Sequence, residues 1–476
     1  MSRAPGADPT LPATTPAEKP AHVASSSPEP EPQPAPGAPI VETVTGTESG
    51  PLQFAADANG PAVLTVGAKA IPLGEVIFVR FAAGVPTPQA QPDPTTVGDP
   101  AATTAHQPFS HVVLSSGDEL LGIVRGGDEA EVRLECASIG AKGGPNSRPF
   151  IAPVSLESID AIAFAASEAP TALDPARRWI REVRAQETKT SQNIPANADD
   201  ILLLTEGAEL RGVLARIDSK AVQFQSSNAG EVAIPLSRVR AIALARDPQS
   251  RERPPGALKS SAISAVVALF DGGLLSGELL ELSEGTVPGN EGADLGRLLL
   301  RHEVFGEVQI PTSRVESVRI RGGRCQFLSD LEPASVTHRA DLFSPWPMRR
   351  DAAVTGSTLR LRGREHRKGL GMHSHCRAEY QLEGQYQRFQ SILGMDDSAR
   401  PRSLSAERAG AATAVFRAYV DGEVKLERLI RWSDPPVAVD LPLEGAKKLA
   451  LELDYGPGSF VLDRGDWAGA RVIKNS

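Results

Sequence analysis

Aromatic residues and cysteine are scarce in this chain of 476 residues. It holds 4 Trp, 4 Tyr and 3 Cys, and aromatic residues make up only 5% of it. Cys136, Cys325 and Cys376 fit neither a disulfide framework nor the paired CxxC spacing of a structural zinc site. The cysteines therefore predict no covalent or metal crosslink, and they do not indicate the redox compartment.

Long apolar runs and an excess of basic charge are also lacking. No apolar run approaches the ~20 residues of a transmembrane helix, so we expect no transmembrane segment. The N-terminus has no basic segment followed by an apolar one, so no signal peptide is visible; an exported protein whose start was placed too far downstream would look the same. The formal net charge is −9, whereas domains that bind nucleic acid usually show a basic footprint. We therefore expect no nucleic-acid partner.

Residues 1–50 are of low complexity and rich in proline, with eleven prolines in the first forty positions. Such a segment cannot bury enough apolar surface to offset the entropy lost on ordering. We predict a disordered tail that serves as a tether.

A repeated pattern fills residues 51–325. An apolar strand, a turn glycine and a second strand recur, and in each copy a second glycine follows the first by five residues: Gly117 and Gly122, Gly207 and Gly212, Gly272 and Gly277. Strands that begin with proline follow, as in IPLSRVRAIAL (234–244), with the alternation of a half-buried strand. We predict three and a half small barrels or rolls of about five strands, in regions 51–165, 196–250 and 260–325, and self-association through them is an open possibility.

One helix interrupts the repeats within a linker at 166–195. Asp174 suits the N-cap position and Pro175 the first helical position. Trp179, Ile180 and Val183 form an apolar stripe. We predict a packing helix that bridges two units, with a partner-binding helix as the alternative.

Residues 326–476 hold most of the aromatic residues and many short alternating segments separated by turn dipeptides such as DG (421–422). Strands at roughly 8–12-residue spacing are typical of a β-sandwich. The predicted fold class is thus all-β: repeated small units, one bridging helix and a C-terminal sandwich.

An ordered series of motifs in this region resembles the NPCBM family, a carbohydrate-binding module that occurs beside glycoside hydrolases and in many planctomycete proteins. The series is RGREHRKGLGMHS (362–374), YQLEGQYQRFQSILGMDD (380–397), VFRAYVDGEV (415–424), DPPVAVDLPLEGAKKLALELD (434–454) and DRGDWAGARVI (463–473). The resemblance implies a jelly-roll-like sandwich that binds glycans, galactose-type sugars among them, without cutting them, and it implies a structural calcium ion. One position departs: the family often has an acidic residue where this chain has Gly469.

The stretch KGLGMHSHC (368–376) concentrates His373, His375 and Cys376. On a strand the two histidines face the same side, but zinc needs three or four ligands and no second cluster is visible. We favour a strand in which Gly369 and Gly371 allow close backbone approach. His373 then becomes a candidate sugar ligand through the family motif.

Asp396 and Asp397 follow a predicted strand. Paired carboxylates suit calcium, sugar hydroxyls or the capping of a turn. They do not suit glycoside hydrolysis, because adjacent side chains on an extended chain diverge.

Asp463, Asp466 and Trp467 form a further candidate sugar site, because an aromatic face stacks on a pyranose while carboxylates accept from hydroxyls. The alternative is that Trp467 is a core residue of the last strand. The basic run RLRGREHRK (360–368) suits sulfated or uronic-acid glycans, or the solvated face of an edge strand.

No nucleophile or acid–base constellation is visible. We therefore predict a non-catalytic, exported glycan-binding protein that requires no cofactor apart from the calcium ion implied above. The alternative is a structural or protein-interaction scaffold of the cell envelope without sugar binding.

Overall fold

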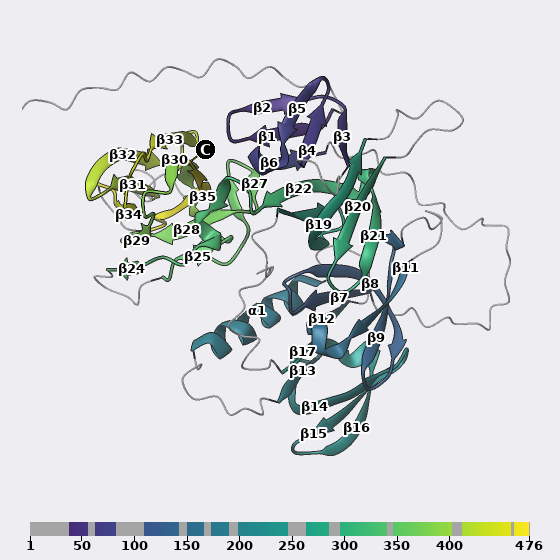
Figure 1. Ribbon diagram of the computed structural model, residues 1–476. Helices are drawn as coiled ribbons and strands as arrows, with labels where there is room; N and C mark the ends of the chain where they lie inside the picture. The colour runs from purple at the N-terminus through teal and green to yellow at the C-terminus, as the bar shows by residue number, and fades with distance from the viewer. Residues whose placement is uncertain are drawn as a thin grey trace, which may run out of the picture.

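The computed structural model describes residues 38–55, 62–81, 109–141, 150–165, 173–189, 199–245, 263–284, 296–339, 346–401, 412–457 and 461–475. The described chain forms four small β-units, one helix and a C-terminal sandwich (Figure 1). This confirms the predicted all-β fold class.

The four units share one plan: an antiparallel meander, a single 3-10 turn, and a last strand that pairs back onto the first. Unit 1 consists of β1 (Ile40–Thr43), β2 (Thr47–Ser49), β3 (Leu52–Ala55), β4 (Val63–Val66), β5 (Lys69–Pro72) and β6 (Val76–Arg80). Unit 2 consists of β7 (Phe109–Leu114), β8 (Glu119–Gly127), β9 (Glu131–Cys136), β10 (Gly140–Ala141), β11 (Phe150–Ser155) and β12 (Ile159–Ala165).

Units 3 and 4 repeat the plan with five strands each. Unit 3 consists of β13 (Asp200–Leu204), β14 (Glu209–Ile217), β15 (Ala221–Ser226), β16 (Gly230–Pro235) and β17 (Val239–Ala243). Unit 4 consists of β18 (Ser264–Leu269), β19 (Leu274–Ser283), β20 (Arg297–His302), β21 (Gly306–Pro311) and β22 (Val315–Arg321).

The second glycine of each predicted pair lies where the second strand bends against the third. A Cβ atom on Gly122, Gly212 or Gly277 would lie only 2.2, 2.0 or 2.3 Å from a carbonyl oxygen of the neighbouring strand. No larger residue fits that approach, which explains why the glycine recurs at this place in the sequence.

Unit 1 corrects two predictions. It is a complete unit rather than a half, and its strands β1 and β2 lie within residues 1–50, so the predicted disordered tail reaches too far; residues 1–37 lie outside the described chain. The strand that is continuous in the other units is divided here at Gly50, into β2 and β3. Its glycines, Gly46 and Gly50, are four residues apart, so the unit does not match a pattern of two glycines five residues apart.

The prolines of the repeats also lie elsewhere than predicted. Pro72, Pro235 and Pro311 end β5, β16 and β21 and precede the 3-10 turns, instead of starting a strand. Their φ angles of −55° to −59° match the value that the proline ring imposes. Proline therefore directs the chain into the turn that leads to the last strand.

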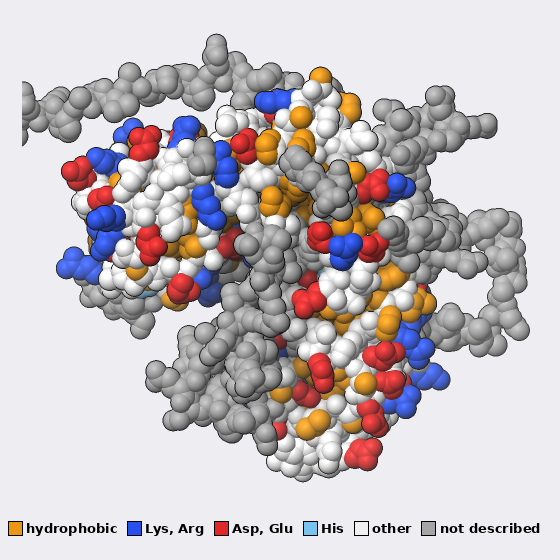
Figure 2. Space-filling view, in the orientation of Figure 1, with side chains coloured by type: hydrophobic (Ala, Val, Ile, Leu, Met, Phe, Trp, Pro, Cys, Tyr) orange, Lys and Arg blue, Asp and Glu red, His pale blue; other side chains and the backbone are white. Residues whose placement is uncertain are grey.

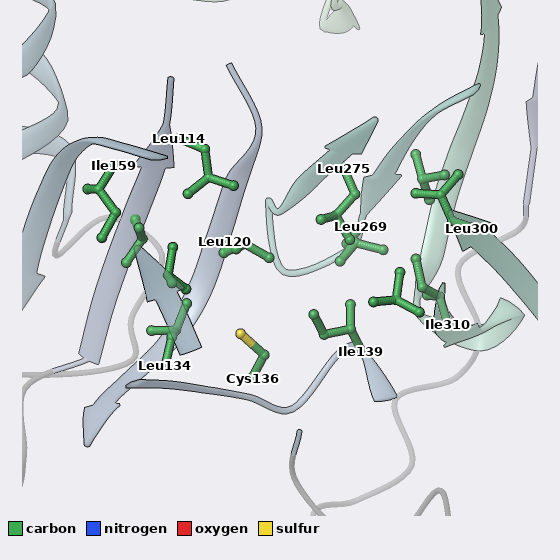
Figure 3. Packing of buried hydrophobic residues seen from close by; sticks show 14 of the residues in the cluster. Leu114, Leu120, Leu134, Cys136, Ile139, Ile159, Leu269, Leu275, Leu300 and Ile310 are labelled. Carbon is green, nitrogen blue, oxygen red and sulfur yellow. The ribbon is translucent and has the colours of Figure 1, made fainter. Parts of the chain in front are cut away.

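The units associate through their last strands. β12 of unit 2 pairs antiparallel with β17 of unit 3, and β22 of unit 4 pairs antiparallel with β6 of unit 1; we call these contacts the 2/3 seam and the 4/1 seam. Units 2 and 4 then share a core, in which Ile139 lies beside Leu269 and Ile310 (Figure 3). A buried hydrogen bond joins the same two units, from His302 Nε2 to Asp118 Oδ2 at 2.9 Å.

Helix α1 (Asp174–Lys189) covers the 2/3 seam and bridges units 2 and 3, as predicted for a packing helix. Ile180 and Val183 pack onto the alanines of β12 and β17, and the indole of Trp179 donates to Glu209 Oε1 at 2.7 Å. Within the described residues, no helix is long and apolar enough to cross a membrane.

The C-terminal sandwich consists of two antiparallel sheets and a small hairpin. The first sheet contains β23 (Cys325–Phe327), β25 (Arg349–Arg350), β28 (Gly369–His373), β30 (Tyr386–Met395), β33 (Val437–Pro442) and β35 (Arg464–Lys474). The second contains β24 (Ser335–His338), β29 (Cys376–Gln381), β31 (Thr413–Val420), β32 (Glu423–Arg431) and β34 (Lys448–Tyr455), and the hairpin is β26 (Leu359–Leu361) with β27 (Arg364–His366).

Three glycines of the sandwich explain parts of the sequence motifs. A Cβ atom on Gly369 or Gly371 would lie 2.6 or 2.4 Å from a backbone oxygen, which confirms the predicted close approach. Gly469 has a φ of +61° and lies where the pairing of β30 with β35 shifts register. The departure from the acidic residue of the family therefore accompanies a bulge whose backbone favours glycine.

The sandwich docks onto the 4/1 seam. Phe327 and Ile473 of the sandwich pack with Val44 and Ile77 of unit 1, and the Phe327 ring lies edge-on to Phe78 at 5.7 Å. An ion pair from Arg471 to Glu42, at 2.6 Å, adds a polar contact.

Candidate functional site

The predicted site residues gather at one end of the first sheet of the sandwich. In β28, His373 pairs with Arg464 at the start of β35, and Met395 at the end of β30 pairs with Gly465. Asp396 and Asp397 directly follow β30, and Asp463 directly precedes β35. Strands that are distant in sequence thus bring the candidates together, but they bury most of them.

Trp467 lies in the core. It is fully buried, with its ring centroid 5.4 Å from that of Phe416 and 6.1 Å from that of Phe389. A sugar cannot reach the face of this ring, so the prediction that Trp467 stacks on a ligand is wrong. The alternation of β35 turns the residue inward, as the core interpretation expected.

Asp466 and Asp396 form a buried carboxyl pair, with exposed fractions of 1% and 2%. No donor of the described residues bonds to either carboxyl oxygen of Asp466. Burial raises the pKa of Asp466 well above its usual range, and the charge of Asp396 raises it further. Burial therefore favours the neutral form of Asp466, and neither carboxyl is presented to a surface ligand.

Asp463 is fully buried as well. Its carboxyl accepts from Ser374 Oγ at 2.9 Å and from the Thr413 amide at 3.2 Å. Burial raises the pKa of Asp463 to about 7. This carboxyl joins the loop after β28 to the start of β31, and it does not reach the surface as a sugar ligand would.

The carboxylates of Asp396 and Asp397 serve as turn caps. Asp396 accepts from the amides of Ser398 and Arg360, at 2.9 and 3.1 Å, and Asp397 accepts from the amide of Gly363 at 2.8 Å. In the described part of the chain, no group of three or more His, Cys, Asp or Glu residues is placed to hold a metal ion. Both carboxylates thus hold backbone amides, and a calcium ion at them stays a prediction.

Cys376 and His375, from the stretch KGLGMHSHC (368–376), also have structural roles. Cys376 is fully buried, and burial raises the pKa of its thiol to about 12, so it is no nucleophile. His375 Nε2 lies 3.7 Å from Glu452 Oε2, on the second sheet.

His373 stays near the surface, beside a residue that the sequence did not single out. The ring of Trp346 is 5.5 Å from the ring of His373, and the Arg464 guanidinium lies over Trp346 at 5.1 Å. Trp346 is 40% exposed, the highest value for an aromatic side chain of the described sandwich. We call Trp346, His373 and Arg464 the Trp346 cluster. The prolines on both sides of Trp346, in SPWPM (344–348), are the one sequence signal that could have indicated it.

The protonation state of His373 follows from its contacts. Its Nδ1 lies 2.8 Å from the carbonyl oxygen of Ser374 and must donate to it. Burial lowers the pKa of His373, so the ring is neutral at pH 7 and Nε2 is left as an acceptor. The cluster therefore combines an exposed aromatic face, one acceptor and the donors of a guanidinium.

Comparisons with known proteins bear on the sandwich. Residues 324–473 match the model of the NPCBM/NEW2 domain. No curated protein matches the chain. A CBM51 module from Clostridium perfringens GH95, solved with methyl-galactose, is 27% identical over 31% of this chain and 99% of its own, with a TM-score of 0.26.

Two further solved structures are similar over parts of the chain. The CBM51-2 and INT domains of Clostridium perfringens ZmpB are 24% identical over 40% of each chain, with a TM-score of 0.28. The tandem CBM51 modules of Sp3GH98 from Streptococcus pneumoniae are 16% identical over 58% of this chain and 88% of theirs, also at 0.28. The family match confirms the resemblance seen in the sequence: residues 324–473 are an NPCBM/NEW2 domain, a carbohydrate-binding module.

Proposed function

We propose that the sandwich binds a glycan at the Trp346 cluster, and that the protein acts by binding rather than by catalysis. The observation that carries the proposal is the exposed ring of Trp346 with polar groups on it, in a domain of a carbohydrate-binding family. Galactose-like sugars are the first ligands to test, because one similar module was solved with methyl-galactose.

The chemistry of the cluster suits a sugar. The apolar C–H face of a pyranose stacks on an indole, while its hydroxyl groups need both acceptors and donors. His373 Nε2 supplies an acceptor, and Arg464 has donors left besides the one that Nη1 gives to the Ser398 carbonyl oxygen at 2.9 Å.

Calorimetric titration of the full-length chain with methyl-galactose and with N-acetylglucosamine tests the proposal, after a glycan array has ranked ligands. Trp346→Ala should lower the affinity for the best ligand at least tenfold, because the stacking surface is lost. Leu429→Ala is the matched control, since Leu429 is similarly exposed, at 37%, on β32 of the other sheet. Unchanged affinity in Trp346→Ala would place the binding elsewhere.

Two further experiments test the rest of the proposal. Incubation of the chain with chromogenic glycosides should release no product. Titrations with EDTA and with calcium test the predicted calcium ion, because a difference in affinity between them would show that an ion supports binding. Product release that persists after further purification would contradict a binding role.

Export and self-association also remain predictions. Glycan binding suits a place outside the cytoplasm, and cell fractionation would test it. Light scattering of the full-length chain across a concentration series would test self-association, and a constant monomer mass would contradict it.

A further inference from the structure

A second aromatic and basic cluster lies next to the first on the sandwich. Arg362, at the tip of the β26–β27 hairpin, places its guanidinium 5.3 Å from the ring centroid of Trp432. Arg400, after the 3-10 turn Asp397–Ala399, places its own guanidinium 5.4 Å from the same centroid. We call Arg362, Arg400 and Trp432 the Trp432 cluster. Two exposed cations are thus held against one half-buried indole.

The two guanidinium groups have no ion-pair partner within the described chain. Arg362 donates through Nη2 to the Ser433 carbonyl oxygen at 2.7 Å, which leaves most of its five N–H donors available. Other arginines of the sandwich are paired with carboxylates: Arg350, Arg360, Arg367, Arg377, Arg388, Arg417 and Arg471.

The acidic residues that neighbour the cluster in sequence cap turns and form no ion pair with its arginines. Asp397 accepts from the Gly363 amide at 2.8 Å, and Asp434 accepts from the Arg431 amide at 2.8 Å. Basic and acidic side chains are interspersed over the face of the sandwich in Figure 2, so the number of charges does not single out this place. What distinguishes it is that two guanidinium groups stack on one indole and lack carboxylate partners in the described chain, so their donors can bind an anion.

One short turn connects the two clusters. The Ser398 carbonyl oxygen accepts from Arg464 of the Trp346 cluster, at 2.9 Å, and Asp397 holds the Gly363 amide of the hairpin that carries Arg362. Arg400 follows in the same turn. The Trp346 and Trp432 clusters are therefore adjoining parts of one surface, which an oligosaccharide could contact with successive rings.

We propose that the glycan bound by this domain is acidic, and that Arg362 and Arg400, held by Trp432, bind its sulfate or carboxylate group. A guanidinium presents paired N–H donors in one plane, which match two oxygens of a carboxylate or sulfate. Stacking on the indole orients each fork before the ligand arrives. This inference rests on the proposed function, because it names the class of glycan that the same surface recognises.

The test compares a sulfated galactan oligosaccharide with its desulfated form, by calorimetry on the full-length chain at low ionic strength. The wild type should bind the sulfated form about tenfold more tightly, since charge-assisted hydrogen bonds add to the binding energy. The double variant Arg362→Gln, Arg400→Gln should lose this preference and keep its affinity for the desulfated form. Arg362→Lys should fall between, because charge remains while the planar fork is lost.

Arg428→Gln is the matched control, because Arg428 is exposed on β32 and has no carboxylate partner among the described residues. An equal loss in this control would show a general effect of charge and overturn the inference. Equal binding of both oligosaccharides by the wild type would overturn it too, while leaving the proposed function standing. Binding of neither form would contradict the proposed function itself. If duplex DNA at equal charge displaced the sulfated form, the site would bind polyanions in general, and the inference of an acidic glycan would be overturned.

Discussion

The 2/3 seam and the 4/1 seam are built on the same register and covered by different elements. In β12 and β17 the outward residues are alanines, whereas β22 and β6 have larger or charged residues at the same positions. The equivalent pairs are Ala161 and Ser317, Ala163 and Arg319, Ala241 and Phe78, Ala243 and Arg80. Alanine lets helix α1 approach β12 and β17 closely, whereas the larger side chains of β22 and β6 meet the sandwich by ring contacts and ion pairs.

At one equivalent position, each seam has a carboxylate that pairs with an arginine of the element that covers it. Asp160 of β12 pairs with Arg184 of α1, and its equivalent in unit 4, Glu316 of β22, pairs with Arg367 of the sandwich. The first pair is buried, with side chains 12% and 3% exposed, while the second is 46% and 39% exposed. The repeated units thus hold two unrelated elements by equivalent ion pairs, one of which is buried and the other exposed.

The largest loss of stability should come from giving one seam the residue that the other seam has at the equivalent position. Ala163→Arg introduces the residue that unit 4 has at that place, Arg319, beneath α1. Because Ala163 is fully buried, the new side chain overfills the space under α1 and takes a charge out of water, so we expect a loss of ~3–5 kcal/mol. Hydrogen exchange of α1 followed by mass spectrometry should show that the helix loses protection.

The reverse change, Arg319→Ala, is the control. Arg319 is paired with Asp330 at 3.2 Å and lies over the Phe327 ring at 5.7 Å, so the sandwich should dock less tightly while β22 stays folded. Retained protection of α1 in Ala163→Arg would show that the alanines do not determine which element covers the seam.

An intermediate effect should separate the two carboxylate contacts. Arg184→Leu removes the buried ion pair with Asp160 and the hydrogen bonds to the Asp160 and Leu244 carbonyl oxygens, so we expect a loss of ~2–4 kcal/mol. Arg367→Leu removes an exposed pair and should cost under ~1 kcal/mol. Urea unfolding monitored by exchange in units 2 and 4 would give both values. Similar losses of stability in the two variants would contradict the idea that the buried ion pair contributes more than the exposed one.

The comparison also shows what the sequence could reveal. Alternation, turn glycines and a capped amphipathic segment were sufficient for the repeated units and α1, because each signal is local. The pairing of last strands could not be predicted, since Ala241 and Phe78 look alike as apolar positions in a strand. Unit 1 was predicted only as half a unit, because Gly46 and Gly50 break the five-residue spacing on which the pattern was defined.

The candidate site was predicted less well for a related reason. The motifs brought the correct strand ends together, so His373 and the paired aspartates do lie at one end of the sheet. Sequence could not tell which side chains face outward there, and Trp467, Asp463 and Asp466 are buried. Trp346 and Trp432 contribute the aromatic rings instead, from segments outside the strongest motifs.

The smallest effect, and the most specific to the comparison, should come from salt. At ~1 M NaCl the screening length falls to ~3 Å, so exposed pairs weaken while buried ones change little. Arg367–Glu316 is exposed, whereas Arg184–Asp160 is not, so salt should raise exchange at the sandwich side of the 4/1 seam by an amount that corresponds to under ~1 kcal/mol. The amides of α1 should be unaffected. Because Arg367→Leu already lacks the exposed pair, the salt effect should shrink in that variant, and a full effect there would show that other charges, such as Arg471 and Glu42, hold the sandwich in place.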